Sequence, residues 1–239
     1  MADDPHAAAP LIALEGVSKI YGMGDAQVRA LVDVDLTIQQ GAFVAIMGPS
    51  GSGKSTAMNI IGCLGTPTSG DYRFGGHSVS KLTRNSRAML RRHFIGFVFQ
   101  GFNLLARTTA LENVELPLIY RGVAAARRRE LALQALEKVG LAERAGHTAS
   151  ELSGGQQQRV AIARAIVTDP AVLLADEPTG NLDTNTGREI MELIGDLNER
   201  GGITVVMVTH EAHIAAYAQR KVHFLDGRIA ADEMNRKAA

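Results

Sequence analysis

The chain has 239 residues, of which 46% are hydrophobic, and its formal net charge is zero. This length fits one large domain, or one domain with a subdomain, and the neutral balance argues against a nucleic-acid binder, which usually carries a basic excess. The single cysteine, Cys63, excludes an internal disulfide and is expected to be a small apolar core residue on a helix. The first residues lack a signal-peptide pattern, and no apolar run approaches the ~18 residues that span a membrane.

In chain order, residues 1–10 are expected to be disordered, and the first patterned element is "LVDVDLTIQ" at positions 31–39. Two alternating sets of residues run through it: Leu31, Asp33, Asp35, Thr37 and Gln39 in one, and Val32, Val34, Leu36 and Ile38 in the other. Alternation with one apolar set predicts a strand solvated on one face, which is typical of antiparallel sheets.

Four later apolar runs are continuous instead of alternating, at positions 43–47, 95–99, 171–175 and 203–208. Such runs predict strands buried on both faces, as in a parallel sheet. Near the end, Asp226 and Gly227 stand between two short apolar runs and predict a hairpin turn. The polar residues after Ile229, including the tail 231–239, are expected to fray.

Helical spacing of apolar residues occurs between these strands. It predicts helices from Lys54 to Leu64, over 131–139, from Gly155 to Thr168, and around 190–197. The region 83–166 is mostly helical, so we expect a helical subdomain inserted into a single α/β domain that spans residues 11–230. The predicted fold is therefore α/β, with a mostly parallel sheet, an antiparallel β edge and the inserted α-helical subdomain.

A glycine-rich stretch, "GPSGSGKST" at positions 48–56, follows the predicted strand 43–47 and opens a predicted helix. Its spacing is that of a P-loop, in which backbone N–H groups hold phosphate oxygens, a lysine reaches the β- and γ-phosphates and a hydroxyl binds Mg²⁺. Lys54 and Ser55 stand at these last two positions. The residues expected to bind a nucleoside triphosphate are Gly48, Ser50, Gly51, Ser52, Gly53, Lys54, Ser55 and Thr56.

Two carboxylates, Asp176 and Glu177, directly follow the apolar run 171–175. The end of a buried strand is a poor place for carboxylates that are merely solvated, so both are expected to be functional. Asp176 is expected to bind Mg²⁺ through water, as the corresponding aspartate does in P-loop enzymes. Because successive side chains point to different sides, Glu177 can face an attacking water while Asp176 faces the metal.

Three further residues lie at or beyond predicted strands. His210 comes just after 203–208, and its strand is expected to neighbour the one that carries Asp176, which favours a functional histidine over a structural one. Gln100 follows 95–99, where a neutral amide can ligate Mg²⁺ or orient water without adding charge. Tyr21 follows "LEGVSKI", which is expected to be the first strand. It can stack on an adenine ring or simply cover the sheet, and the spacing does not choose between these two roles.

The stretch "LSGGQQQR" at 152–159 offers exposed glycine N–H groups and one hydroxyl at the start of a predicted helix. A helix N-terminus suits an anion, so Ser153, Gly154, Gly155 and Gln156 are candidates for a second phosphate site. One nucleotide cannot easily be enclosed by this stretch and by the P-loop of the same chain. The economical arrangement is a head-to-tail homodimer with two nucleotides, each held by the P-loop of one chain and by this stretch of the other.

These motifs, in this order, resemble the nucleotide-binding subunits of ATP-binding cassette (ABC) transporters. The P-loop resembles their Walker A motif, "LSGGQ" their signature, "VLLADE" their Walker B motif and "GNLD" their D-loop, with Asp183 as its aspartate. Gln100, His210 and Tyr21 fall at the positions of the Q-loop glutamine, the H-loop histidine and the A-loop aromatic residue. Stretches such as "FVFQGFNLL" and "LADEPTGNLD" are similar to the MacB/LolD group within this family.

The resemblance implies an ATPase with ATP and Mg²⁺ as cofactors, in which Glu177, His210 and Gln100 serve catalysis while Ser55, Gln100 and Asp176 serve the metal. It implies a homodimer that forms on ATP binding and moves an integral-membrane permease subunit, with a periplasmic adaptor reached through that subunit. The expected location is the cytoplasmic face of the inner membrane. The alternative is an FtsE-like regulatory ATPase that controls a membrane partner without transport.

The segment 101–122 is expected to receive a coupling helix of the membrane subunit, because it lies between Gln100 and the signature. Its apolar stretches "NLL" and "LPLI" can equally be plain core. The basic clusters at 91–92 and 127–129 are expected to mark solvated helix faces, and no nucleic-acid partner is expected.

Overall fold

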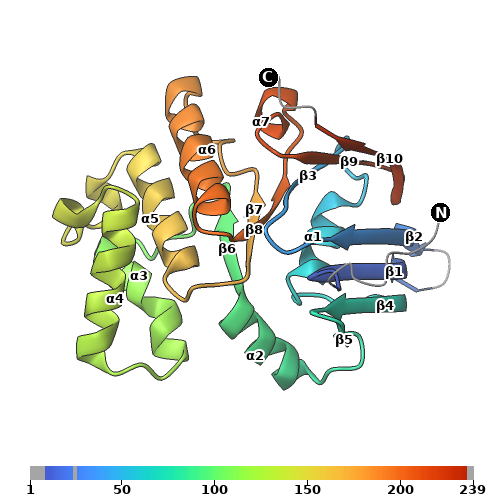
Figure 1. Ribbon diagram of the computed structural model, residues 1–239, viewed down its shortest axis with the longest axis horizontal. Helices are drawn as coiled ribbons and strands as arrows, with labels where there is room; N and C mark the ends of the chain where they lie inside the picture. Colours follow the sequence, from blue (N-terminus) through green and yellow to red (C-terminus); the bar gives the residue numbers. More distant parts are fainter. Residues whose placement is uncertain (1–8, 24–25, 236–239) are drawn as a thin grey trace.

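A six-stranded sheet runs through the computed structural model, which describes residues 9–23 and 26–235 (Figure 1). Its strands, in spatial order, are β10 (Arg228–Met234), β9 (Arg220–Leu225), β3 (Phe43–Met47), β8 (Thr204–Val208), β7 (Val172–Asp176) and β6 (Ile95–Phe99). All neighbours are parallel except β10, which joins β9 through the predicted hairpin. The four continuous apolar runs are thus confirmed as the adjacent parallel strands β3, β8, β7 and β6.

A second sheet is antiparallel and has the order β2-β1-β4-β5, formed by β2 (Val28–Ile38), β1 (Ile12–Tyr21), β4 (Ser69–Phe74) and β5 (His77–Ser78). The predicted alternation holds from Val34 to Ile38, but the placement of Leu31 on the solvated face is wrong, because Leu31 is fully buried. Asp33 has a φ of 52°, and the pairing with β1 shifts register here. A bulge adds one residue and turns the side chains over, so Leu31 and Val34 face the same core.

The helices are α1 (Lys54–Ile61), α2 (Arg84–Phe94), α3 (Ala110–Tyr120), α4 (Ala125–Lys138), α5 (Gly154–Ile166), α6 (Thr184–Glu199) and α7 (Ala212–Ala215). The predicted extension of the first helix to Leu64 is wrong: α1 ends at Ile61, and Leu64 is exposed. Cys63 lies just beyond the helix with a φ of 56°, so it is buried as expected but is not helical.

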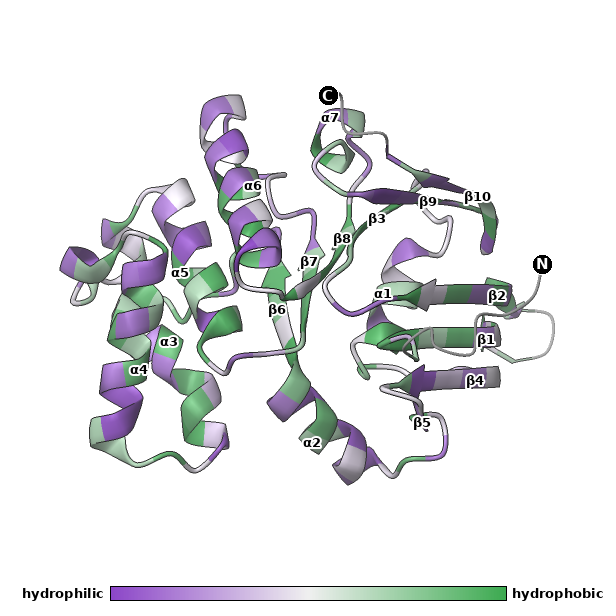
Figure 2. Ribbon diagram, viewed as in Figure 1, coloured by the Kyte–Doolittle hydropathy of each residue, from purple (hydrophilic) through white to green (hydrophobic). Residues whose placement is uncertain are grey.

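Alternate side chains of the central strands enter two different hydrophobic cores. Phe43 and Ala45 of β3 belong to one cluster, which also contains buried residues of α3, α4, α5 and α6. Val44 and Ile46 belong to the other cluster, together with α1 and the second sheet. Because both faces are covered, the central strands are hydrophobic throughout, as the colouring in Figure 2 shows.

Helices α3, α4 and α5 pack on one another at one side of the six-stranded sheet, while α2 lies apart from them (Figure 1). The range 83–166, expected as a helical insert, also contains β6, which is an edge strand of that sheet. Within this range the chain therefore enters the six-stranded sheet from α2, and it leaves that sheet once, for α3 to α5. Among the described residues, no helix combines the length and apolar character that crossing a membrane requires.

The expectation that the chain frays after Ile229 is wrong for the residues that can be described. Strand β10 continues to Met234, and Arg220 Nε donates to Asp232 Oδ1 at 2.6 Å. The Asn235 side-chain amide donates to the carbonyls of Ala216 and Ala218 at 2.9 Å each. Polar pairing thus orders an element that has little apolar burial. Residues 236–239, and residues 1–8 of the segment expected to be disordered, lie outside the described part of the chain.

Candidate functional site

The glycine-rich loop connects β3 to α1, as predicted. Gly48 has a φ of 146°, and a Cβ there would lie 2.2 Å from the Phe224 carbonyl oxygen, so only glycine fits beside β9. The Gly227 N–H donates to the Ser52 carbonyl at 3.0 Å, which ties the loop to the β9–β10 turn. Lys54 is only 9% exposed, and its Nζ donates to the Pro49 carbonyl at 2.7 Å. The lysine is therefore folded back over its own loop.

The start of α1 suits an anion. Gly53 occupies the N-cap position with a φ of 103°, and no side chain caps the first turn. The helices α2, α3, α5 and α6, in contrast, begin at residues whose side chains accept from a first-turn amide: Thr83, Thr109, Ser153 and Asp183. The first amides of a helix have no intrahelical partner, so those of α1 are available to phosphate oxygens.

The other P-loop residues divide by exposure. Ser50, Gly51 and Ser55 are exposed, and Thr56 is half-buried. Ser52 is buried, and its Oγ has no hydrogen-bond partner among the described residues. A buried hydroxyl without a partner is costly, which points to a polar group that completes the loop when it is occupied.

The strand ends bring the remaining candidates to one edge of the sheet. Phe99 of β6 pairs with Asp176 of β7, and Asp176 pairs with Val208 of β8. Gln100, Glu177 and the pair Thr209–His210 therefore follow three adjacent strands at their carboxyl ends. The loop after β3 joins them there, because β3 pairs in parallel with β8. The prediction that the strands before Asp176 and His210 are neighbours is confirmed.

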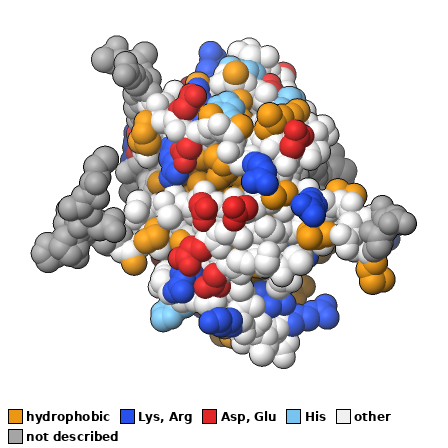
Figure 3. Space-filling model, turned by 90° about the vertical axis from the view of Figure 1, so that its right-hand side faces the viewer, with side chains coloured by type: hydrophobic (Ala, Val, Ile, Leu, Met, Phe, Trp, Pro, Cys, Tyr) orange, Lys and Arg blue, Asp and Glu red, His pale blue; other side chains and the backbone are white. Residues whose placement is uncertain are grey.

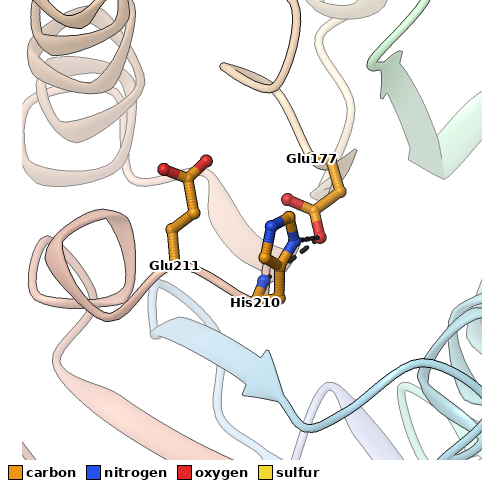
Figure 4. A group of neighbouring side chains, drawn as sticks. All are labelled: Glu177, His210 and Glu211. Atoms are coloured by element: carbon orange, nitrogen blue, oxygen red, sulfur yellow. Dashed lines mark hydrogen bonds and ion pairs between the residues drawn. The ribbon is translucent and has the colours of Figure 1, made fainter.

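Glu177 and His210 are in direct contact (Figure 4). The carboxylate Oε1 lies 2.7 Å from His210 Nδ1 and accepts from the His210 backbone N–H at 3.1 Å, while Oε2 accepts from the Thr209 hydroxyl at 3.3 Å. This hydrogen bond and the negative charge of Glu177 raise the pKa of His210 above its ordinary value. Glu177 itself has a φ of 46°, and its N–H donates to the Val208 carbonyl at 2.9 Å.

Asp176 lies in an environment that favours a bound cation. Its side chain is half-buried, and desolvation together with the adjacent Glu177 carboxylate raises its pKa, while Lys54 acts in the opposite direction. A cation near Asp176 would offset the desolvated negative charge. Glu177, His210 and Glu211 also place ligand-type atoms within 4.8 Å of one another, but His210 Nδ1 is already paired with Glu177.

Gln100 is held against the segment that follows Glu177. Its Nε2 donates to Asn181 Oδ1 at 3.3 Å, and Asn181 Nδ2 donates to the Gln100 carbonyl at 3.0 Å. A Cβ on Gly180 would lie 2.7 Å from Gln100 Nε2, so the Gln100 side chain packs closely on this glycine. The structure thus brings Gln100 to the "GNLD" segment.

The "LSGGQ" stretch starts α5, and two of its side chains form a capping box. Ser153 Oγ accepts from the Gln156 N–H at 3.3 Å, and Gln156 Oε1 accepts from the Ser153 N–H at 3.0 Å. A Cβ on Gly155 would lie 2.3 Å from Thr186 Cγ2, so this glycine lets α5 approach α6. In Figure 1, α5 and α1 lie on opposite sides of the central strands. The stretch and the P-loop of one chain are therefore separate.

Asp183 and Tyr21 complete the predicted set. Asp183 caps α6, accepting from the Asn185 and Thr186 amides at 3.1 Å each and from the Thr186 hydroxyl at 2.6 Å. The Thr186 hydroxyl bond, before the amide bonds, lowers the pKa of Asp183. Tyr21 ends β1 with 46% of its surface exposed, and Lys19 Nζ lies 5.0 Å from its ring centroid.

Gln158 was not predicted. It is fully buried, and its Nε2 donates at 2.5 Å to the carbonyl of Pro178, the residue after Glu177. The helical spacing contains this information: Gln158 precedes Ala161, Ile162 and Ala165 by three, four and seven residues, and all three are buried. A glutamine on the buried face of a helix requires a polar partner.

A protein-family model described as "ABC transporter" matches residues 31–180. The chain belongs to the ABC transporter family. This ABC chain is 54% identical over 224 residues to the macrolide export ATP-binding/permease protein MacB 1/2 of Paracoccus denitrificans, covering 94% of this chain and 33% of that protein. It is 50% identical to the pyoverdine export ATP-binding/permease protein PvdT of Pseudomonas fluorescens, covering 93% of this chain and 34% of that protein. It thus spans about a third of the length of these curated relatives.

A solved structure, a dimeric ATP-binding cassette in a post-hydrolysis state bound to ADP and Pi, matches this ABC chain with a TM-score of 0.86. The sequence identity is 47%, and the match covers 94% of this chain and 99% of that one. The predicted α/β fold, the resemblance to ABC transporters and its MacB group, and ATP as the ligand are therefore confirmed. Homologous ABC domains hydrolyse ATP, so the chain is an ABC ATPase domain.

Proposed function

We propose that this ABC domain hydrolyses Mg-ATP at a head-to-tail dimer interface and thereby moves a membrane subunit in a MacB-like export or envelope system. The observation that carries the proposal is the shared edge of the six-stranded sheet. The P-loop after β3, Asp176 at the end of β7 with Glu177 after it, and His210 after β8 meet there. An anion-binding loop beside paired carboxylates and a histidine is suited to cleaving a phosphoanhydride bond.

Different residues of this chain would bind the phosphates, the Mg²⁺ ion and the adenine ring. The first amides of α1 and the loop glycines would bind phosphate oxygens, and Lys54 would exchange the Pro49 carbonyl for the β- and γ-phosphates. Ser55, Asp176 and Gln100 would hold Mg²⁺, which supplies charge neutralisation and Lewis-acid assistance when bound. The raised pKa of Asp176 supports a cation there. The exposed ring of Tyr21 would stack on adenine.

Glu177 would act on the attacking water. Its carboxylate is fixed by the Thr209 hydroxyl and by both the backbone N–H and the ring of His210. The side chain of His210 is 67% exposed, and in its protonated form, which the raised pKa favours, Nε2 can donate to a γ-phosphate while Nδ1 donates to Glu177. Gln100 would orient the same water or the metal from the neighbouring strand. Catalysis would then be positioning plus electrostatic stabilisation.

The dimer follows from the separation of α5 and α1 within one chain. Ser153 Oγ accepts from the Gln156 N–H, which leaves the hydroxyl proton free to donate to a phosphate. The amides of Gly154 and Gly155 and the side-chain amide of Gln156 would add donors, and Asp183 would face the same interface. The dimeric cassette bound to ADP and Pi supports this arrangement by similarity. Each nucleotide would then be held by the P-loop of one chain and the signature of the other.

A groove of about 580 Å³ supports the proposal that a membrane subunit binds this chain. Its lining comes mainly from α2, β6, α3 and α5, including Phe97, Leu116, Pro117 and Tyr120, and Leu64 from beyond the end of α1 also contributes. The segment 101–122 was expected either to receive a coupling helix or to be plain core, and its residues divide between these roles. Leu111, Val114 and Leu118 are buried core, whereas Leu116 and Pro117 line the groove. A coupling helix of an integral-membrane permease would bind here, on the cytoplasmic side, with a periplasmic adaptor reached through the permease.

Export is favoured over the FtsE-like regulatory alternative by similarity to the MacB and PvdT export proteins. Nucleic acid remains an unsupported partner. Arg92, Arg127 and Arg129 are exposed, as expected for solvated helix faces. Arg91 and Arg128 differ from this expectation, because Arg91 Nη1 donates to the Cys63 carbonyl at 2.7 Å and Arg128 Nη1 to the Val123 carbonyl at 2.8 Å. Acidic and basic side chains are interspersed on the face shown in Figure 3.

The sharing of sites is tested with Ser153→Arg, Lys54→Ala and the control Ser150→Arg, an exposed serine three residues before Ser153. Ser153→Arg should abolish hydrolysis while the monomer still binds ATP, because the signature serves the partner's nucleotide. Lys54→Ala should weaken ATP binding itself, and Ser150→Arg should resemble the parent.

Mixing the first two variants creates dimers with one intact site, so some hydrolysis should return if one site turns over alone. The binding measurement decides. If Ser153→Arg weakens ATP binding by the monomer as severely as Lys54→Ala does, the signature acts on its own chain's nucleotide, and the sharing of sites is wrong.

A further inference from the structure

Arg164, near the end of α5, reaches across to the turn that follows Gln100. Its Nη1 donates to the Asn103 carbonyl at 2.6 Å, and its Nη2 donates to the Phe102 carbonyl at 2.8 Å. One planar guanidinium therefore holds two successive carbonyl oxygens. Its side chain is half-buried, and this burial lowers its pKa. A guanidinium in such a place contributes fixed geometry as well as charge.

The turn needs this support because its backbone is unfavourable. Phe102 has a φ of 60° and Asn103 a φ of 52°, so two consecutive residues other than glycine are left-handed. Asparagine tolerates this conformation, but phenylalanine does not do so readily. The local hydrogen bonds are the Phe102 N–H to the Phe99 carbonyl at 3.2 Å and the Asn103 N–H to the Gly101 carbonyl at 2.6 Å. Tertiary contacts must supply the remaining stabilisation.

One further contact ties the turn to α5, and another ties α5 to β6, the strand before the turn. A Cβ on Gly154, at the start of α5, would lie 3.8 Å from Phe102 Cζ, so the phenylalanine ring lies beside the signature. At the other end, a Cβ on Gly96 of β6 would lie 2.4 Å from the Ala165 carbonyl oxygen, so α5 and β6 are in backbone contact. The turn thus lies along α5 between its first and last turns.

We propose that Arg164 is a positioning residue that sets the place of Gln100 by clamping the turn 101–103 to the helix that begins with the signature. The inference rests on the proposed function, in which Gln100 serves the metal and the water. A displacement of α5 relative to the sheet would carry this turn with it. Arg164 and Asn103 also line the groove proposed for the membrane partner, so an occupant of that groove would contact the clamp directly.

The first test measures hydrogen exchange of the backbone amides 101–105 in the nucleotide-free protein. Arg164→Lys keeps the charge but cannot hold two carbonyls with one planar group, and Arg164→Met removes every donor. Arg129→Met, an exposed arginine on α4, is the matched control. Both Arg164 variants should speed exchange by about 10- to 100-fold, the range that loss of a hydrogen bond to a charged group implies. Amides of β7 should not change.

The second test is a double-mutant cycle with Gln100→Ala, scored by the Mg²⁺ concentration that half-saturates hydrolysis and by the maximal rate. If Arg164 acts through Gln100, Arg164→Lys should raise the Mg²⁺ requirement in the parent but change little in Gln100→Ala. Unchanged exchange at 101–105 in Arg164→Met, or additive effects in the cycle, would overturn the proposal. Full activity of Gln100→Ala would refute the function proposed for Gln100, and with it any effect of Arg164 on catalysis through Gln100. The hydrogen-exchange measurement would still show whether Arg164 holds the turn 101–103 in place.

Discussion

Replacing Glu177 with glutamine separates the chemical step from nucleotide binding. Glutamine keeps the length of the side chain and one acceptor oxygen, which can still accept from the His210 backbone N–H. In the parent, the other oxygen accepts from the Thr209 hydroxyl at 3.3 Å. In the variant this oxygen becomes an NH₂ group, which donates to the Thr209 hydroxyl instead of accepting from it. The geometry at the strand ends should therefore survive, and what is lost is the negative charge and the basicity.

Loss of general-base assistance costs about 10²- to 10⁴-fold in rate, which is about 2.7–5.4 kcal/mol of activation free energy. ATP affinity should stay within a few-fold of the parent, because Lys54 and the amides of α1 are untouched. Since the step that opens the proposed dimer is blocked, Glu177→Gln should accumulate with Mg-ATP as a dimer in sizing chromatography. Asp176→Asn should instead form little dimer, because it weakens the support for Mg²⁺.

The same substitution should change the titration of His210. Its pKa is raised first by the hydrogen bond to Glu177 and then by the carboxylate charge, so Glu177→Gln should lower it toward the ordinary value. In the parent, this pair stabilises the fold fully below the unfolded-state pKa of His210 and loses that effect as pH rises through the raised folded-state pKa. NMR titration of the imidazole measures the shift. If Glu177→Gln hydrolyses ATP within a few-fold of the parent rate, Glu177 is not the general base, and His210 becomes the next candidate.

Two further predictions concern residues at the margins of the site. Tyr21→Ala should weaken ATP binding with little effect on folding, whereas Tyr21→Phe should be nearly silent, because stacking uses the ring and not the hydroxyl; equal affinities of Tyr21→Ala and the parent would end this assignment. Burial raises the pKa of the Cys63 thiol to about 11, so iodoacetamide at pH 9 should label the unfolded chain and spare the native one. Labelling of native protein at the rate of a free thiol would show that Cys63 is accessible.

The sheet and its edge could be predicted because their causes are local. Continuous apolar runs require burial on both faces, and a P-loop between such a run and a helix has few other interpretations. The adjacency of β7 and β8, and hence of Asp176 and His210, followed from the rule that functional residues gather at the carboxyl ends of parallel strands. The first two inferences needed only the sequence near the residues in question, and the third needed this general rule as well.

The features that escaped prediction depend on contacts between distant segments. The burial of Leu31 requires the bulge at Asp33, which the alternation of side chains cannot reveal. The order of β10 depends on Arg220 pairing with Asp232 and on Asn235 binding the carbonyls after α7. Arg164 shows no local sign of its two carbonyl partners, which lie 61 and 62 residues earlier.

Helix α5 connects these distant contacts to the proposed chemistry. It begins at Ser153, donates from Gln158 to Pro178 beside Glu177, and donates from Arg164 to the turn beside Gln100. The 11 steps from Ser153 to Arg164 span about 16.5 Å of helix at 1.5 Å per residue, and we expect this short helix to move as one body. In the proposed dimer, Ser153 binds the partner's nucleotide. If binding of the partner's nucleotide shifts α5, the shift would therefore act on Glu177 and Gln100 of its own chain together. This gives a physical reason for coupling between the two nucleotide sites of the proposed dimer.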